Sequence, residues 1–581
     1  MGVFVNDYPD EAFIVRAALT SSFVALAIGG LMGIIQTLHR TGFYDSLISN
    51  ADYYTVLTLH GVAMVLLFTI FFLVGFFQWA VTDSLGRSSE DIRITKLWYA
   101  MMVLGAGMSA VTILGGFVDA GSLSGVDADV LYTFYAPLEA HPLYYIGLAT
   151  FIIGTWIAGF DWFRSWWAWK RENPDERTPL RTFMVLTTML MWYLASLGVA
   201  ISVVFFLIPW SLGIFESVNS LLTRTLFWFF GHPVVYFWLM PVYMMWYVIL
   251  PKLAGGRLFS DPLARIVFVL FLVLSVPTGI HHQYVDPGIA EGFKFLAMTN
   301  TMFLLLPSFL TAFTVVASIE HGARQRGGKG YFSWLTALPW GRPAFTGMTL
   351  AGLMFAAAGF SGMINAGMSI NYLVHNTLWV VGHFHMTVGT AVALSIMAAT
   401  YWFLPIITGR EIFSRRLGLA QVLMWFVGMV FMGNAMHRAG LAGVPRRTAD
   451  PTYSQFDYTN TFGAVTELRF QIALGAVFLT TSLLLFFAPL VLSSFDIGER
   501  AAATPDSIPT PLSGPEHAPA VLDNIRLWTS VAIVLILLTY ILPIASIVSD
   551  GGFLGSYGAI VVDQIAALLS PVLDTGGGVI G

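Results

Sequence analysis

Long apolar runs constrain the fold of this chain more than any other feature. Stretches of about 20 apolar residues follow one another from residue 12 to residue 549, and a helix of that length crosses the hydrocarbon core of a bilayer. Only 10% of the 581 residues are charged, against roughly 25% in typical soluble domains. The sequence therefore predicts an all-α polytopic membrane protein. The dispersed net charge of −5 gives no sign of a nucleic-acid partner.

Glycine, proline and charged residues divide the apolar sequence into about thirteen expected transmembrane helices. The start, MGVFVNDYPDEAF, lacks the basic stretch and cleavage site of a signal peptide, so we expect the first helix to remain in the membrane. Residues 1–581 are then a single membrane-embedded domain with spans over about 12–549, and residues 550–581 are a tail at the membrane interface. The spans are expected near 12–36, 56–81, 97–118, 143–163, 183–208, 225–251, 266–284, 296–320, 345–368, 375–406, 417–437, 470–495 and 527–549.

Basic residues are unevenly distributed between the two sets of connections. The loops after even-numbered spans hold 20 Lys and Arg residues, whereas the loops after odd-numbered spans hold 7. Basic loops stay on the cytoplasmic side, which predicts a cytoplasmic N-terminus and, with thirteen spans, an external C-terminus. The polar, Pro-rich stretch 497–524 is then a cytoplasmic connection.

Six of the twelve histidines lie inside expected spans, where an unpaired ionisable group is expensive. Any one of them alone is as readily a hydrogen-bonded structural residue as a ligand. In the predicted topology, however, all six fall at one level in the outer third of the membrane, which favours a common layer of metal ligands. They are His60, His232, His281, His282, His383 and His385.

The spacing of these histidines predicts how they divide between cofactors. His383 and His385 are two residues apart, so they leave one helix about 200° from each other and suit two separate planar haems. His60 on another helix provides the second axial ligand of one haem, which makes that haem six-coordinate and low-spin. The other haem keeps an open position.

The remaining three histidines suit a third metal. His281 and His282 are adjacent near a helix end, and they converge with His232. Three neutral imidazoles are suited to copper or zinc and, less uniquely, to iron. The chain has no cysteine, so redox chemistry within it rests on His, Tyr and bound cofactors. An open haem that faces this metal forms a site able to bind and split a diatomic molecule.

A stripe of tyrosines leads away from His232. Tyr236, Tyr243 and Tyr247 lie within about 20° of one line on a helix. The hydroxyls of Ser308, Thr311 and Thr314 on the next helix but one, with Ser260 in a basic loop, extend this stripe as a path for protons from the cytoplasm. The alternative is that Ser and Thr merely bond to their own helix or a neighbour.

At this point the chain resembles the catalytic subunit I of haem–copper terminal oxidases over nearly its whole length. The motifs that carry the resemblance occur in the family's order and on the expected spans. They are TLHGV at 58–62, GHPVVYFWLMP at 231–241, HHQYVDPG at 281–288, HNTLWVVGHFHMTVG at 375–389 and VPRR at 444–447.

The resemblance implies a role for each motif residue. It implies that His60 and His385 ligate the low-spin haem, that His383 ligates the high-spin haem, and that His232, His281 and His282 hold one copper ion. Tyr236 is then covalently joined to His232 and supplies an electron and a proton when the O–O bond breaks. The implied neighbours of the haem propionates are Arg446, Arg447, His375 and Asn376.

Two positions indicate the branch of the family. Val234 replaces the glutamate that ends a second proton path in mitochondrial-like members, so a single path remains. With the hydroxyl stripe, this resembles the type B branch of prokaryotic oxidases. Asn371 departs from the aspartate of that branch.

The function expected from these features is reduction of O2 to water, with protons taken up from the cytoplasm and further protons pumped outward across a prokaryotic plasma membrane. Because the chain lacks cysteine, a subunit II with a dinuclear copper domain is expected to deliver electrons, alongside small additional subunits. The external donor is then a cytochrome c or a blue-copper protein, or a quinol if subunit II lacks copper. The alternatives are a nitric oxide reductase with non-haem iron at the three-histidine site, and a non-catalytic haem-bearing electron conduit.

Overall fold

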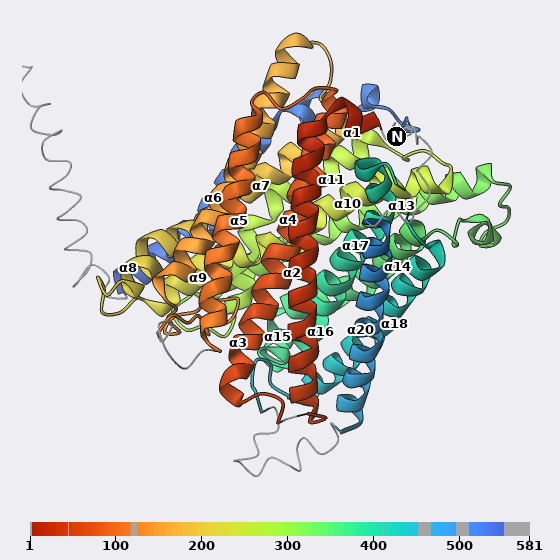
Figure 1. Ribbon diagram of the computed structural model, residues 1–581. Helices are drawn as coiled ribbons and strands as arrows, with labels where there is room; N and C mark the ends of the chain where they lie inside the picture. The colour runs from red at the N-terminus through yellow and green to blue at the C-terminus, as the bar shows by residue number, and fades with distance from the viewer. Residues whose placement is uncertain are drawn as a thin grey trace, which may run out of the picture.

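The computed structural model describes residues 3–44, 46–117, 125–410, 412–450, 466–494 and 510–550, and these residues are almost entirely helical (Figure 1). The α-helices are α1 Val3–Asp7, α2 Pro9–Thr41, α3 Asn50–Gly61, α4 Thr69–Leu85, α5 Ile92–Gly115, α6 Pro142–Glu172, α7 Leu180–Ser202, α8 Ile208–Ser211, α9 Ser220–Gly231, α10 Pro233–Ala254, α11 Asp261–Leu274, α12 Glu291–Phe303, α13 Leu305–Gln325, α14 Pro343–Ala366, α15 Met368–Val374, α16 Leu378–Met386, α17 Ala393–Thr408, α18 Arg415–Leu441, α20 Thr466–Ser494 and α21 Ile525–Asp550.

Shorter helical turns join several of these elements. The π-helical turns are η1 Val62–Phe68, η2 Val203–Leu207 and η5 Thr387–Val392, and the 3-10 turns are η3 Val276–Gln283, η4 Ser333–Ala337, η7 Pro515–His517 and η8 Ala520–Asp523.

Within the described part of the chain, 12 continuous helical segments are long and apolar enough to span a membrane. Helices α11 and η3 meet at an angle of 51°, and they make a thirteenth span if this bent pair is counted as one. Each segment corresponds to one predicted span, so the predicted all-α membrane fold is confirmed. Residues 551–581 of the predicted tail 550–581 and residues 497–509 of the polar connection lie outside the described residues.

The helix ends follow local sequence rules. Ser49 begins α3 with a capping box, in which its side chain accepts from the Asp52 amide while the Asp52 carboxylate accepts from the Ser49 amide. Ser260 and Ser414 cap α11 and α18 with a single bond each, in which the serine side chain accepts from the amide three residues ahead. These caps satisfy amides that have no partner within the helix.

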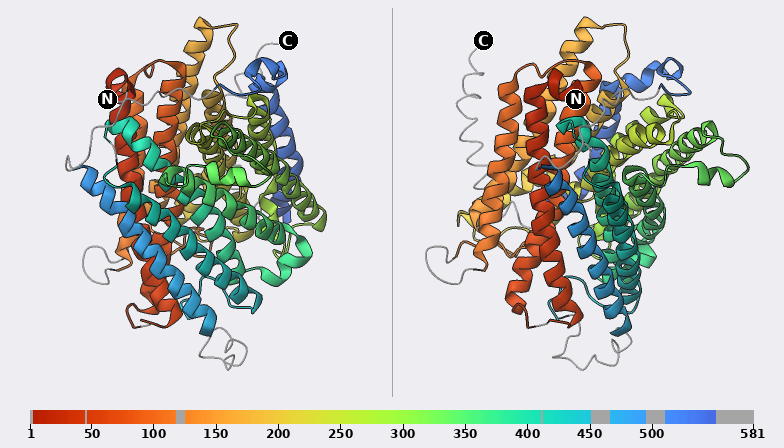
Figure 2. Two further views of the ribbon diagram at one scale, coloured as in Figure 1. Left: turned by 90° about the vertical axis from the view of Figure 1, so that its right-hand side faces the viewer. Right: turned by 45° about the vertical axis from the view of Figure 1, so that its right-hand side comes forward.

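Burial identifies the centre of the bundle. In the segment Ser220–Ala254, which comprises α9 and α10, 94% of the most apolar window is buried, against 28% in Glu467–Ser493 of α20. Helices α18 and α20 pack side by side on one flank, next to α2 (Figure 2). A Cβ added at Gly428 of α18 would lie 2.9 Å from the Gly475 carbonyl of α20, so this close crossing requires small residues.

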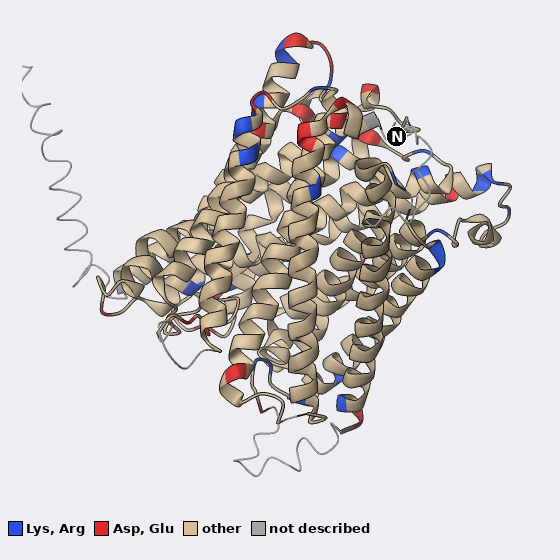
Figure 3. Ribbon diagram, viewed as in Figure 1, with Lys and Arg blue, Asp and Glu red and all other residues tan. Residues whose placement is uncertain are grey.

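Charged residues gather at the two ends of the bundle and are rare between them (Figure 3). More of them gather at the end where the chain begins than at the opposite end (Figure 3). This agrees with the charge asymmetry of the loops. Which end faces the cytoplasm stays a prediction.

Apart from η2, the irregular helical turns within the spans lie beside the predicted ligand histidines. The π-helical turn η1 begins two residues after His60, η5 begins two residues after His385, and η3 contains His281 and His282. Pro277 has a non-helical ψ of 18° at the bend that opens η3, where its missing N–H leaves a break in the helix. Non-helical backbone at membrane depth is tolerated where it lines a cavity, and all three turns adjoin the cavity described next.

Candidate metal centre and proton path

A cavity of about 610 Å³ lies inside the bundle, and all six histidines of the predicted layer line it. Tyr236, Ser308 and the four residues predicted beside haem propionates also line it. Tyr243, Tyr247, Thr311, Thr314 and Ser260 are not among its lining residues and lead away from it. The structure thus gathers side chains from spans far apart in sequence around one enclosed space.

His232, His281 and His282 form a compact cluster at one wall of the cavity. One ring nitrogen of each lies within 4.8 Å of one ring nitrogen of the others. The Nδ1 atom of His232 is 3.1 Å from the Nε2 atom of His282, and two imidazole nitrogens on one metal ion at about 2 Å lie roughly 3 Å apart. No carboxylate joins this cluster among the residues that the structure describes, so the donor set fits copper better than a metal that prefers oxygen ligands.

Neighbouring side chains fix each ring of the cluster. His232 lies where α9 meets α10, and the hydroxyl of Tyr236, one turn further on, is 2.7 Å from its Nε2 atom. Thr301 of α12 is hydrogen-bonded to Nδ1 of His281 at 2.8 Å. The indole of Trp228 stacks on the His282 ring with 3.7 Å between centroids. Such outer partners hold imidazoles in the tautomer and direction that a metal needs.

His60 and His385 face each other across a gap that suits a metal ion. Their rings are parallel within 10° and their centroids are 6.4 Å apart. When two imidazoles bind the same metal ion from opposite sides, each with its nitrogen about 2 Å from the metal, the ring centroids are roughly 6 Å apart. Nδ1 of His60 is bonded to the Gly29 carbonyl and Nδ1 of His385 to the Val381 carbonyl. Each ring therefore keeps Nε2 free. A Cβ at Gly33 would lie 2.9 Å from His60, so the wall beside this ring requires glycine.

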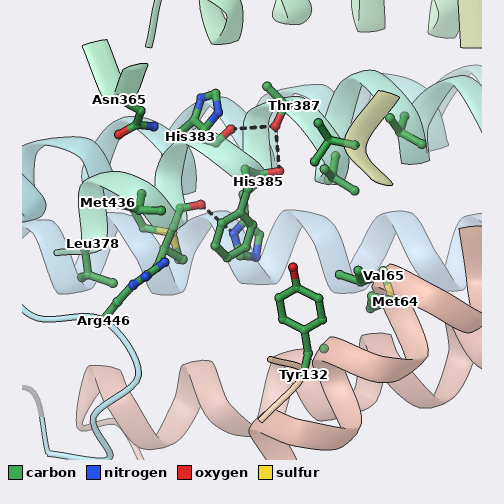
Figure 4. A pocket seen from close by; sticks show the side chains of 18 of the residues that line it. Met64, Val65, Tyr132, Asn365, Leu378, His383, His385, Thr387, Met436 and Arg446 are labelled. Atoms are coloured by element: carbon green, nitrogen blue, oxygen red, sulfur yellow. Dashed lines mark hydrogen bonds between the residues drawn. The ribbon is translucent and has the colours of Figure 1, made fainter. Parts of the chain in front are cut away.

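His383 points to the other side of α16. Figure 4 shows the rings of His383 and His385 leaving this helix in opposite directions. Nδ1 of His383 is 2.8 Å from the hydroxyl of Ser361 on α14, which again leaves Nε2 free. His383 and His385 therefore reach the cavity from opposite sides of α16.

Arg446 and Asn376 meet at the cavity rim. The guanidinium of Arg446 donates to Oδ1 of Asn376 at 3.0 and 3.2 Å, and the Arg446 amide donates to the Asn376 carbonyl. Asn376 and Arg447 have positive φ values of 58° and 68°, a conformation that costs free energy in residues other than glycine and marks functional loops. Burial and the nearby Arg446 lower the pKa of His375 to about 4.

The tyrosine stripe meets hydroxyls of α13. Tyr243 donates to Ser308 at 3.1 Å, and the hydroxyls of Tyr247 and Thr311 are 2.7 Å apart. Thr314 donates to the Leu310 carbonyl of its own helix, and Ser260 caps α11. The Tyr243–Ser308 and Tyr247–Thr311 contacts therefore join α10 to α13, whereas Thr314 and Ser260 bond within their own segments.

Sequence reasoning missed the side chains that orient the histidines. Ser361, Thr301 and Trp228 contact His383, His281 and His282. Trp228 precedes His232 by one helical turn, a spacing that could have identified it. Ser361 and Thr301 come from spans whose pairing with the histidine helices is not readable from one sequence.

Most of the chain is similar to proteins of known function. Residues 13–499 match the family model described as cytochrome c and quinol oxidase polypeptide I. Cytochrome c oxidase subunit 1 of Thermus thermophilus is 41% identical over 534 residues, which cover 90% of this chain and 92% of that protein. A probable cytochrome c oxidase subunit 1-alpha of Streptomyces coelicolor is 27% identical over 76% of this chain and 74% of its own. A solved haem–copper terminal oxidase dimer has a chain that superposes with a TM-score of 0.85, at 36% identity over 92% of both chains.

Proposed function

This chain belongs to the cytochrome c and quinol oxidase polypeptide I family and is the catalytic subunit of a haem–copper terminal oxidase, and we propose that it reduces O2 to water beside His232, His281, His282 and His383. The family implies haem and copper, a multi-pass membrane location and partner subunits in a respiratory chain. The absence of a carboxylate from the three-histidine cluster, within the described ranges, supports copper at this position over the iron of a nitric oxide reductase.

The six histidines divide between three groups in this proposal. His60 and His385 would hold a low-spin haem, because their parallel rings each keep Nε2 free. His383 would hold a high-spin haem on the opposite side of α16. His232, His281 and His282 would hold one copper ion. When bound, the high-spin haem and the copper bind O2 and deliver electrons to it.

The chain's own residues move protons to this centre. The hydroxyl of Tyr236 contacts His232 at 2.7 Å, so Tyr236 is the last proton donor before the cavity. Tyr236 and Tyr243 are seven residues apart, which is about 10 Å along the helix. In this proposal bound water carries the proton across that gap. Tyr243 and Tyr247 receive protons through Ser308 and Thr311. Thr314 and Ser260 continue the path towards the basic loops.

This path serves both chemistry and pumping in our proposal, as in the type B branch. Val234 carries no acid at the position next to His232 and Tyr236, so no carboxylate ends a second path there. Moving one charge against 100 mV costs about 2.3 kcal/mol, and O2 reduction is downhill enough to drive several such steps. Protons enter from the cytoplasmic side, where we place the N-terminus and the basic loops of a prokaryotic plasma membrane.

Electrons enter from the outer side. The chain has no cysteine, so a dinuclear copper site belongs to a second subunit, which passes electrons from cytochrome c or a blue-copper protein to the haem at His60. A quinol replaces that donor if subunit II carries no copper. Arg446, Arg447, His375 and Asn376 would neutralise or bond the haem propionates at the cavity rim.

The test of this proposal is a cluster variant in the whole complex. His282→Ala removes one of three imidazoles and is expected to abolish O2 reduction and release copper, while the spectrum of the low-spin haem stays intact. His517→Ala, at a histidine side chain that is 66% exposed, is the matched control and keeps full turnover. Retained turnover in His282→Ala contradicts the assignment.

A further inference from the structure

The six proposed ligands are not the only histidines near the cavity. His437 lies on α18, four residues before the last residue of this helix, Leu441. Its ring faces α16, the helix that provides His383 and His385. The residue before it, Met436, lines the cavity beside these ligands (Figure 4). A seventh histidine therefore lies against the helix from which two of the proposed haem ligands project.

Glycines bring the backbones of α16 and α18 into close contact around His437. A Cβ added at Gly382 of α16 would lie 2.7 Å from Nδ1 of His437 and 2.9 Å from the Gly433 carbonyl. A Cβ added at Gly440 of α18 would overlap the backbone amide of Trp379. Small residues permit such close crossings of helices in membranes. The position of α16 along this line is therefore set by direct contact with α18.

The ring of His437 is itself held in one orientation. Its Nδ1 atom is 2.7 Å from the Gly433 carbonyl, one turn earlier on the same helix, so Nδ1 carries the proton and Nε2 is an acceptor. The indole of Trp379 meets the imidazole edge to face, with 4.5 Å between centroids. Nε2 of His437 and Nε1 of Trp379 are both buried without a partner among the described residues. They form an acceptor and a donor on adjacent helices that a single bound water can join.

A second contact holds the ligand segment at its other end. Trp425 of α18 donates to the Gly389 carbonyl in η5 at 2.8 Å. Gly389 follows His385 by four residues, and Gly382 immediately precedes His383. The two proposed haem ligands therefore lie between two points at which their helix is fixed to α18.

We propose that His437 is a positioning residue for both haems, an inference that rests on the proposed function. Its ring sets the separation of α16 and α18 at Gly382, beside the backbone from which His383 and His385 leave in opposite directions. A shift of α16 at this point turns both rings at once, because they belong to one helix. Metal ligands keep their direction only where the residues around them hold them in place. The three proposed copper ligands come from other helices and lie outside this effect.

The test compares variants of His437 in the whole purified complex. His437→Ala removes the ring that contacts Gly382. We expect the midpoint potential of the low-spin haem and the iron–histidine stretching frequency of the high-spin haem both to shift. Turnover is expected to fall about tenfold, as is usual when an outer support of a metal ligand is lost, while haem and copper contents stay as in the wild type. His437→Asn keeps an N–H donor to the Gly433 carbonyl, so both signatures are expected to shift in the same direction but less.

His141→Ala is the matched control. Nδ1 of His141 accepts from the Leu143 amide at the start of α6, so this variant also removes an imidazole with a local hydrogen bond. Both haem signatures are expected to stay as in the wild type. Unshifted signatures in His437→Ala overturn the proposal, and so does a shift at one haem alone. If His437→Ala does not retain its haems, His437→Asn decides the same question: shifts at both haems support the proposal, and wild-type signatures overturn it.

The spectrum of the wild-type complex separates this inference from the function on which it rests. Electron paramagnetic resonance of the oxidised protein is expected to show one low-spin haem with two histidine ligands, and His385→Ala is expected to lose that signal. If the wild type lacks the signal, the ligand assignment of the proposed function is wrong. If the signal is present and His437→Ala leaves both haems unchanged, only the positioning role is wrong.

Discussion

Two buried polar networks in the membrane part of this chain resemble each other in composition and differ in what they connect. In the first, which we call the Gln78 network, Gln78 donates to Thr82 and Ser89 and accepts from Trp162, and Thr95 donates to Asp161. The second is the tyrosine path, in which Tyr243 and Tyr247 contact Ser308 and Thr311. Both networks join helices across the bundle with hydrogen bonds of about 2.7 to 3.1 Å.

The Gln78 network and the tyrosine path differ in their surroundings. The side chains of the Gln78 network do not line the histidine cavity. Trp162 packs against Phe77, which packs against Phe237, and Phe237 stacks on Trp192 with centroids 4.1 Å apart. The tyrosine path instead begins at Tyr236 and Ser308, which line the cavity.

A buried polar side chain in a membrane is therefore not by itself evidence of a proton path. Hydrogen bonds between such groups can serve only to hold helices together. A path additionally needs to reach the reacting site and to leave room for a proton to move. We therefore expect substitutions in the tyrosine path to change turnover and substitutions in the Gln78 network to change stability.

The largest effect is expected at the inner end of the tyrosine path. Tyr236→Phe removes the hydroxyl next to His232, so turnover falls by about 10²- to 10⁴-fold while both haem spectra remain. Oxygen consumption and the carbon-monoxide spectrum measure this. Tyr401→Phe, which removes a buried hydroxyl bonded to Gln421, is the control. Turnover above a tenth of wild type in Tyr236→Phe would show that the path ends elsewhere.

A smaller effect is expected one step further from the cavity. Thr311→Val keeps the shape of the side chain but removes the partner of Tyr247, and proton uptake slows by about tenfold. Time-resolved uptake in vesicles measures this rate. Thr188→Val removes a buried hydroxyl that bonds only to the Met184 carbonyl of its own helix and is expected to leave uptake unchanged. If Thr311→Val and Thr188→Val take up protons at the same rate, the hydroxyl of Thr311 has no special role in proton transfer.

A substitution of Asp161 tests whether the Gln78 network carries protons. Asp161→Asn removes a buried carboxylate but keeps an acceptor for Thr95, and we expect unchanged turnover and proton uptake. The measurement is the same vesicle assay, with Thr311→Val as the positive control. Slowed uptake in Asp161→Asn would mean that the Gln78 network also carries protons.

The smallest effect on turnover is expected at Gln78 itself. Gln78→Leu leaves Trp162 and Thr82 without their partner, which lowers the free energy of unfolding by about 1–3 kcal/mol without changing turnover. Thermal unfolding of the purified complex measures the loss. Asp175→Ala, at an exposed residue after α6, serves as a surface control. If Gln78→Leu keeps the midpoint of thermal unfolding but loses turnover, the Gln78 network serves function and not stability, which contradicts this prediction.

Particular residues show how far the sequence could predict this structure. The thirteen spans were predictable because bilayer thickness sets the length of an apolar helix. The bend after Ser275 and the π-helical turns η1 and η5 were not, because their backbone depends on packing around the cavity. The gathering of six histidines followed from shared depth and from a spacing of two residues. Their roles as ligands stay predictions.

Ser318 illustrates a signal that is readable in the sequence. It extends the spacing of Ser308, Thr311 and Thr314 along the same helix, and its buried hydroxyl accepts from the Phe259 amide. Ser361 and Thr301 could not have been found in this way, because their contacts with His383 and His281 join spans distant in sequence.

Metal analysis of the purified complex tests whether the six histidines hold two haems and one copper ion. Haem extraction and copper analysis, combined with the carbon-monoxide spectrum of the reduced protein, should give two haems and one copper per chain after any copper of a partner subunit is subtracted. One haem with an open site should bind carbon monoxide. Two haems with non-haem iron in place of that copper would contradict the account and indicate nitric oxide reduction instead.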